Sequence, residues 1–168
     1  QTGRAIRYNM KYCADPRYCS LKSLIKTGDL YGAKFCYHYL PQELDPFDEA
    51  AFNANPMEFY VVCTDVDTGE AEYHLFENRH DHGLEWIRAS ASMPLVSRMV
   101  EIDGRRYLDG ALADSIPVQY FASIGYDRNV VVLTQPEGFV KTASRGLPFM
   151  RRALRKYPKA AQAMARRH

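Results

Sequence analysis

The chain has 168 residues, of which 46% are hydrophobic and 25% charged, a composition typical of a single globular domain. An aromatic content of 12% excludes an intrinsically disordered chain, and the absence of any run of 18 apolar residues excludes a transmembrane helix. Residues 1–137 contain 13 basic and 20 acidic side chains, whereas residues 138–168 contain nine basic ones and no acid. This asymmetry indicates an acidic body with a basic, surface-seeking tail.

The four cysteines and the N-terminus bear on the compartment of the protein. Cys13, Cys19, Cys36 and Cys63 contain no C-x-x-C pair, which argues against zinc and thioredoxin-like sites. No apolar signal segment is present, so we expect reduced thiols in a cytoplasmic protein, although a disulfide between the first two cysteines is also open. The chain opens with Gln1 rather than Met, and we interpret it as a processed chain or a fragment.

Local signals predict three helices in the first 91 residues. Ser20 is a suitable N-cap and Gly28 a stop for the first helix, and Pro46 suits the first position of the second. Residues 1–19 and 29–45 show little periodicity and are expected to form loops and turns, or, for residues 1–19, the end of an element whose start is missing. The predicted helices cover residues 21–27, 45–53 and 83–91.

Five segments have strand patterns. Residues 58–66 and 129–134 are almost continuously apolar, which is typical of interior strands buried on both faces. Asp103-Gly104 predicts a tight hairpin, and a helix over 117–124 follows that hairpin. The predicted strands are 58–66, 70–76, 99–102, 105–108 and 129–134. Helices between buried strands favour a layered α/β fold.

The basic tail has helical periodicity. An apolar stripe recurs every three or four residues, formed by Leu147, Met150, Leu154, Tyr157, Ala161 and Met164. Pro158 interrupts the pattern, so we expect two helices or one kinked helix. The stripe either packs on the body with its basic face in solvent, or lies on an anionic membrane surface. Contact with nucleic-acid phosphates is a third interpretation, and we do not expect it.

The residues after the hairpin carry the most chemical information. The predicted strand 105–108 delivers the chain to Asp109, and Gly110 follows at once. Glycine permits a positive φ or the close approach of another backbone, so Asp109 sits at a sharp exit from a strand. Such an exit suits an active-site carboxylate, although on local sequence alone the Asp-Gly pair also fits a plain turn.

Six short segments around this residue resemble, in order and spacing, the C-terminal half of the patatin-like phospholipase family. They are Ser90–Pro94, Val100–Gly104, Tyr107–Ala111, Asp114–Val118, Gly125–Asp127 and Val130–Thr134. The resemblance runs from about residue 20 to residue 140, and Thr64–Glu70 fits it as well. It implies a three-layer α/β/α hydrolase fold with a mixed central sheet. Residues 1–140 would form the C-terminal part of that domain, and residues 141–168 a basic amphipathic tail.

The resemblance also implies a catalytic Ser-Asp dyad, with Asp109 as the base and with Gly110 and Ala111 shaping its turn. The expected nucleophile is a serine in a G-x-S-x-G motif, but none of the eight serines has Gly two residues before it. No glycine-rich oxyanion loop is present either. We therefore expect an N-terminally truncated domain that is inactive alone, and that associates with the missing segment or with itself.

The parent protein is then expected to hydrolyse acyl esters of phospholipids or related lipids, without a metal or organic cofactor. Two other hypotheses remain. The chain is either a non-catalytic lipid-surface or partner-binding module of the same fold, or an unrelated α/β domain in which Asp109 points to solvent.

Other polar residues have a chemical and a structural interpretation. Ser90 and Ser92 are substitute nucleophiles or, as we favour, residues that cap and pack the helix end. His80-Asp81-His82 suggests a metal site, but a solvated loop is favoured because no third ligand lies nearby in the sequence. Asp65 and Asp67 are expected to hold their turn through side-chain hydrogen bonds.

Overall fold

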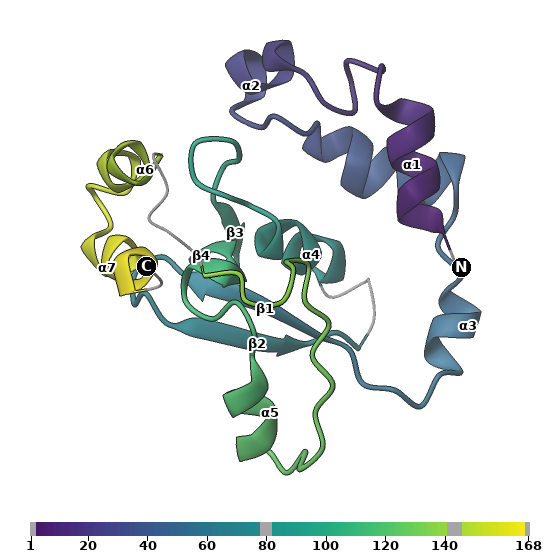
Figure 1. Ribbon diagram of the computed structural model, residues 1–168. Helices are drawn as coiled ribbons and strands as arrows, with labels where there is room; N and C mark the ends of the chain where they lie inside the picture. The colour runs from purple at the N-terminus through teal and green to yellow at the C-terminus, as the bar shows by residue number, and fades with distance from the viewer. Residues whose placement is uncertain (1–2, 78–81, 141–145, 167–168) are drawn as a thin grey trace.

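The computed structural model describes residues 3–77, 82–140 and 146–166. Its centre is a four-stranded sheet with the strand order β2-β1-β4-β3 (Figure 1). The strands are β1 (Tyr60–Asp65), β2 (Ala71–Leu75), β3 (Val100–Ile102) and β4 (Arg105–Asp109). All pairs described are antiparallel, so a mixed sheet stays a prediction.

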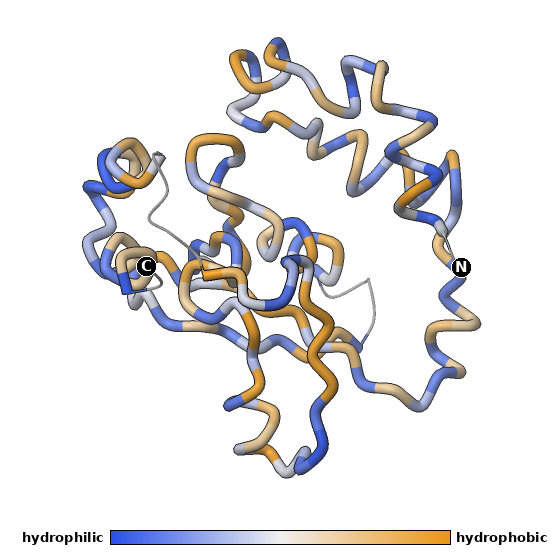
Figure 2. Tube along the Cα trace, in the orientation of Figure 1, coloured by the Kyte–Doolittle hydropathy of each residue, from blue (hydrophilic) through white to orange (hydrophobic). Residues whose placement is uncertain are grey.

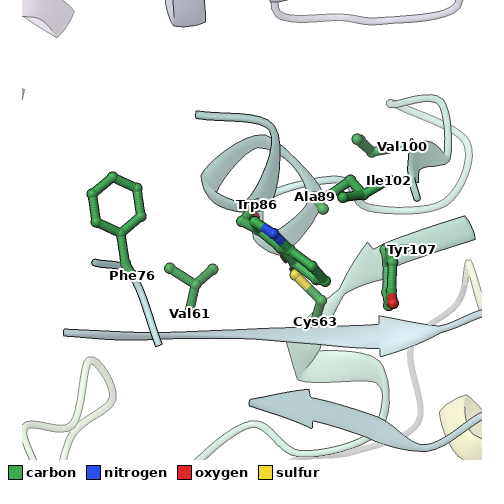
Figure 3. Close-up of a cluster of buried hydrophobic side chains, with 8 residues drawn as sticks. All are labelled: Val61, Cys63, Phe76, Trp86, Ala89, Val100, Ile102 and Tyr107. Atoms are coloured by element: carbon green, nitrogen blue, oxygen red, sulfur yellow. Dashed lines mark hydrogen bonds between the residues drawn. The ribbon is translucent and has the colours of Figure 1, made fainter. Parts of the chain in front are cut away.

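One face of the sheet is covered by α4 (Gly83–Ser90), which ends before Pro94 as predicted. Trp86 of this helix lies over Cys63 of β1 and beside Tyr107 of β4 (Figure 3). The core on this side is completed by Val61, Phe76, Ala89, Val100 and Ile102. Burying such apolar side chains contributes roughly 1.5–3 kcal/mol each, which fixes the helix to the sheet.

On the opposite face, α6 (Leu147–Ala153) and α7 (Pro158–Arg166) pack over the ends of β1 and β4. Pro158 begins α7, so the tail forms two helices, one of the two predicted outcomes. A second buried cluster joins these helices to the sheet and consists of Val66, Leu108, Leu112, Leu154, Ala160 and Met164. Leu108 and Tyr107 are neighbours on β4 and point to opposite faces, as the twofold period of a strand requires. The result is the expected three-layer α/β/α arrangement.

Four helical segments precede the sheet: α1 (Arg4–Tyr12), α2 (Leu21–Thr27), η1 (Phe35–Leu44) and α3 (Glu49–Asn53). The prediction for α2 is confirmed in detail. The Ser20 hydroxyl accepts a 3.0 Å hydrogen bond from the Ser23 amide, and Gly28 ends the helix with a φ of 80°. The prediction for α3 is shifted, because Asp48 caps the helix and Pro46 lies outside it.

The predictions for residues 1–19 and 29–45 are wrong, because these residues contain α1 and the π-helix η1. Both helices depend on contacts between distant segments. Tyr12, Phe35 and Leu40 are buried together, and the rings of Tyr12 and Phe35 meet edge to face with centroids 5.5 Å apart. A local periodicity search misses helices that are stabilised in this way.

The prediction of an interior strand at residues 129–134 is also wrong. The segment follows α5 (Val118–Ser123) and forms no ladder among the described residues (Figure 1). It is hydrophobic along most of its length (Figure 2), yet it is exposed. The exposed fractions of Val130 and Val132 are 94% and 87%. An apolar run becomes a strand only where a neighbour accepts its hydrogen bonds, and β1 and β4 are already paired on both sides.

Candidate functional site

Asp109 is the last residue of β4, and the hairpin before it determines where it lies. Asp103 and Gly104 have φ angles of 51° and 76°, the left-handed pair that a tight hairpin turn requires. The return strand pairs with β1, so that Asp109 lies directly opposite Cys63. Opposite residues of an antiparallel pair share a face, so the side chain of Asp109 leaves the sheet on the α4 side.

The backbone and the side chain of Asp109 are both held. Its amide donates a 2.9 Å hydrogen bond to the carbonyl of Ser92, just beyond α4. Its Oδ1 accepts a 2.8 Å hydrogen bond from the Ala111 amide and so caps the short 3₁₀-helix η2 (Gly110–Leu112). The carboxylate is half-buried at the exit of the strand. These contacts hold the carboxylate in one orientation at the end of β4.

Thr64 holds the other side of this turn. Its hydroxyl is fully buried, donates to the Asp109 carbonyl over 2.8 Å and accepts from the Ala113 amide over 3.1 Å. One side chain of β1 therefore joins the end of β4 to the end of η2. We did not single out Thr64 as a site residue from the sequence. The sequence did offer one signal, a threonine hydroxyl within an otherwise apolar strand. A buried hydroxyl of this kind needs hydrogen-bond partners.

Gly110 is needed for close packing. A Cβ on this residue would lie 2.2 Å from the backbone oxygen of Val62, so no other residue fits without a shift of β1 or η2. The φ angle of Gly110 is not positive. Of the two reasons expected for a glycine here, a positive φ or the close approach of another backbone, the structure therefore shows the second.

Cys63 shares the face of Asp109 but is not a reactive thiol. Burial, followed by the negative charge of Asp109, raises the pKa of Cys63 to about 12. The thiol donates a 3.6 Å hydrogen bond to the carbonyl of Trp86. A thiol with so high a pKa stays protonated at neutral pH and serves as packing. All four cysteines are free, in agreement with the predicted reduced thiols.

The acidic turn after β1 is structural, as predicted. The Oδ1 of Asp65 accepts 2.8 Å hydrogen bonds from the amides of Asp67 and Thr68. Burial opposes ionisation of Asp65, but these two amides and the Arg105 guanidinium together hold its pKa below the usual value. Asp67 forms an ion pair with Arg106 over 2.8 Å and ties the turn to β4.

Among the described residues, the remaining candidate residues form neither a site with Asp109 nor a site of their own. Ser92 is 2% exposed, and its hydroxyl donates to the Arg88 carbonyl at the end of α4, which is the structural role that we favoured. Ser90 is the half-buried last residue of that helix. His80 and Asp81 lie outside the described residues, and His82 faces Asp103 over 3.8 Å. Within residues 3–77, 82–140 and 146–166, no three metal-binding side chains converge.

The C-terminal helices turn a mainly basic face to solvent. Leu154 and Met164, from the predicted apolar stripe, are each 1% exposed against the body. The exposed basic side chains described in residues 146–166 are Arg151, Arg152, Arg155, Lys156, Lys159 and Arg166. The apolar stripe therefore forms part of the hydrophobic core. In the part of the chain that the structure describes, no helix has the length and hydropathy needed to cross a membrane.

Comparisons with known proteins agree with this geometry. The model of a family described as patatin-like phospholipase matches residues 6–122, which include Thr64 and the whole turn from Asp109 to Ala113. Over 148 residues the chain is 26% identical to the uncharacterized protein YjjU of Escherichia coli (strain K12). That match covers 81% of the chain and 38% of YjjU, so the chain spans well under half of this relative's length.

Proposed function

Because the chain belongs to the patatin-like phospholipase family, we propose that the protein carrying it is a serine hydrolase of lipid acyl esters. In this proposal the chain supplies Asp109 as the base of a Ser-Asp dyad, and the serine lies outside these 168 residues. The observation that carries the proposal is the position of Asp109. Its carboxylate lies at the exit of a strand and accepts a hydrogen bond from the Ala111 amide. Its backbone is held by the Ser92 carbonyl and the Thr64 hydroxyl.

The chemistry follows from an activated nucleophile. The Asp109 carboxylate accepts the proton of the serine hydroxyl while that oxygen attacks the ester carbonyl. The same group then gives the proton to the departing alcohol, which leaves an acyl-enzyme. Asp109 then deprotonates the water that attacks the acyl-enzyme and returns this proton to the serine oxygen, which frees the carboxylic acid and restores the serine. Gly110 and Ala111 keep the carboxylate in place, through the close approach to Val62 and through the cap.

The proposed substrates are phospholipids or related acyl-ester lipids. No metal or organic cofactor takes part in the proposed steps, and a nucleic-acid partner is not proposed. We also propose a cytoplasmic protein whose exposed cationic face on α6 and α7 contacts anionic membranes peripherally. Because the apolar stripe is buried, this contact would depend on electrostatic attraction alone. That attraction contributes about 1 kcal/mol per basic residue near the membrane surface.

The isolated chain is proposed to be inactive, because it contributes neither a G-x-S-x-G serine nor oxyanion donors. The exposed apolar run at residues 130–133 favours association with another segment of the parent protein, or self-association. Exposed extended backbone of this kind accepts a neighbouring strand readily.

The test is hydrolysis of a soluble acyl ester by the full-length protein. Asp109→Asn should lower kcat by at least about 100-fold, because the amide cannot accept the serine proton. Its side-chain oxygen can still cap η2, so the fold should be kept. Asp103→Asn is the matched control, since Asn-Gly suits the same hairpin turn.

A non-catalytic module that binds lipid surfaces or a protein partner is the alternative function. It predicts equal activities for Asp109→Asn, Asp103→Asn and the unmodified protein, all at the level of the uncatalysed reaction. Membership of the family excludes the third hypothesis, an unrelated α/β domain.

A further inference from the structure

A cavity of about 540 Å³ lies between the N-terminal helices and the loop that follows α4. Side chains from three segments line it, and those that matter here are Arg17, Asp29, Lys34, Phe35, Tyr39 and Arg98. Asp109 and the rest of its turn are not among the lining residues, so this cavity is separate from the proposed dyad.

Short backbone contacts fix the walls of the cavity. The amide of Leu30 donates to the carbonyl of Val96 over 2.7 Å, and the amide of Arg98 donates to Oδ1 of Asp29 over 2.8 Å. Gly32 lies so close to the preceding wall that an added Cβ would come within 2.1 Å of the Arg17 oxygen. Since the walls are joined in this way, the cavity is preformed, as ligand sites commonly are.

The lining of the cavity carries more positive than negative charge, with Arg17, Lys34 and Arg98 against Asp29. The single lining carboxylate, Asp29, is 7% exposed, accepts the Arg98 amide and lies 3.9 Å from the Arg88 guanidinium, which balances its charge. Arg17 is paired with Asp15 outside the cavity and lies 4.9 Å from the Phe35 ring. Among the residues that the structure describes, Lys34 forms no ion pair, and the Arg98 side chain forms none either.

Apolar surface completes the cavity. The rings of Phe35 and Tyr39 lie 5.8 Å apart, centroid to centroid, and Ala33 lies beside them. An inorganic anion would leave these rings unused, whereas a neutral hydrocarbon would leave Lys34 and Arg98 without a partner. We propose that the cavity binds an anionic amphiphile, a lipid whose phosphate group meets Lys34 and Arg98 while its alkyl chain covers the aromatic wall. Guanidinium and ammonium groups both suit a phosphate.

The experiment is calorimetric titration of the full-length protein with dodecyl phosphate below its micelle concentration. Arg98→Gln and Lys34→Gln should each weaken binding about tenfold, the usual effect of losing one charge-assisted hydrogen bond. Both side chains are exposed, so neither substitution disturbs the core. Arg128→Gln, which removes an exposed charge from the segment after α5, is the matched control and should leave the affinity unchanged.

Three results would overturn the proposal. Unchanged affinity in both Arg98→Gln and Lys34→Gln would show that the phosphate binds elsewhere. Equal affinity for inorganic phosphate would show that the alkyl chain does not contribute to binding. Equal affinity for dodecyltrimethylammonium would show that the negative charge does not contribute. Asp109→Asn should still bind dodecyl phosphate, so failure of this site and failure of the hydrolase proposal are distinguishable.

Discussion

Thr64 shows how a single buried hydroxyl can hold the turn that carries the proposed base. It contacts both the Asp109 carbonyl and the Ala113 amide, which lie on either side of the turn that holds the carboxylate. The role of Asp109 as a base is a proposal that came from the family resemblance. Its position at the end of a strand was predictable, because the hairpin and the following glycine are local signals. The role of Thr64 was not, because its partners lie 45 and 49 residues away in the sequence.

Replacement of Thr64 by Val keeps the shape of the side chain and removes the hydroxyl. The bonds of this fully buried hydroxyl to the Asp109 carbonyl and the Ala113 amide are then lost, and the amide keeps only its 3.1 Å bond to the Gly110 carbonyl. We therefore expect a loss of about 1–3 kcal/mol in the free energy of unfolding. Urea denaturation measures this change. Thr64→Ser retains the hydroxyl and should lose less. Equal stability of Thr64→Val and the unmodified protein would contradict the proposed role.

At the scale of elements, the C-terminal helices belong to the core. The apolar stripe predicted from residues 147–167 was found, and its partners are Val66, Leu108 and Leu112 on the sheet and η2. Packing of α7 against η2 also supports the turn that begins at Asp109. Periodicity predicted the helices, but it could not decide between the body and a membrane as the surface that they cover.

Met164→Ala tests the role of α7 in the core. Met164 is 1% exposed, so its truncation leaves a cavity and should cost about 2–5 kcal/mol of stability. Phe149 on α6 is 67% exposed, and Phe149→Ala is the control, with an expected change within about 0.5 kcal/mol. Thermal or urea unfolding measures both. Similar losses for the two variants would mean that α7 does not form part of the core.

At the scale of the whole molecule, local signals predicted the sheet and most helices, and long-range contacts explain the errors. Caps such as Ser20 and turns such as Asp103-Gly104 depend on neighbours in sequence, so they were read correctly. The helix η1 depends on ring packing between distant segments. Residues 129–134 have the composition of a strand, but composition does not provide a partner strand.

Labelling of the full-length protein with a fluorophosphonate, which reacts with activated serines, tests the central claim most directly. We expect one labelled serine in a G-x-S-x-G motif outside residues 1–168, with labelling abolished in Asp109→Asn and retained in Asp103→Asn. Labelling of Asp109→Asn at the rate of the unmodified protein would contradict the role of Asp109 as the base of a Ser-Asp dyad.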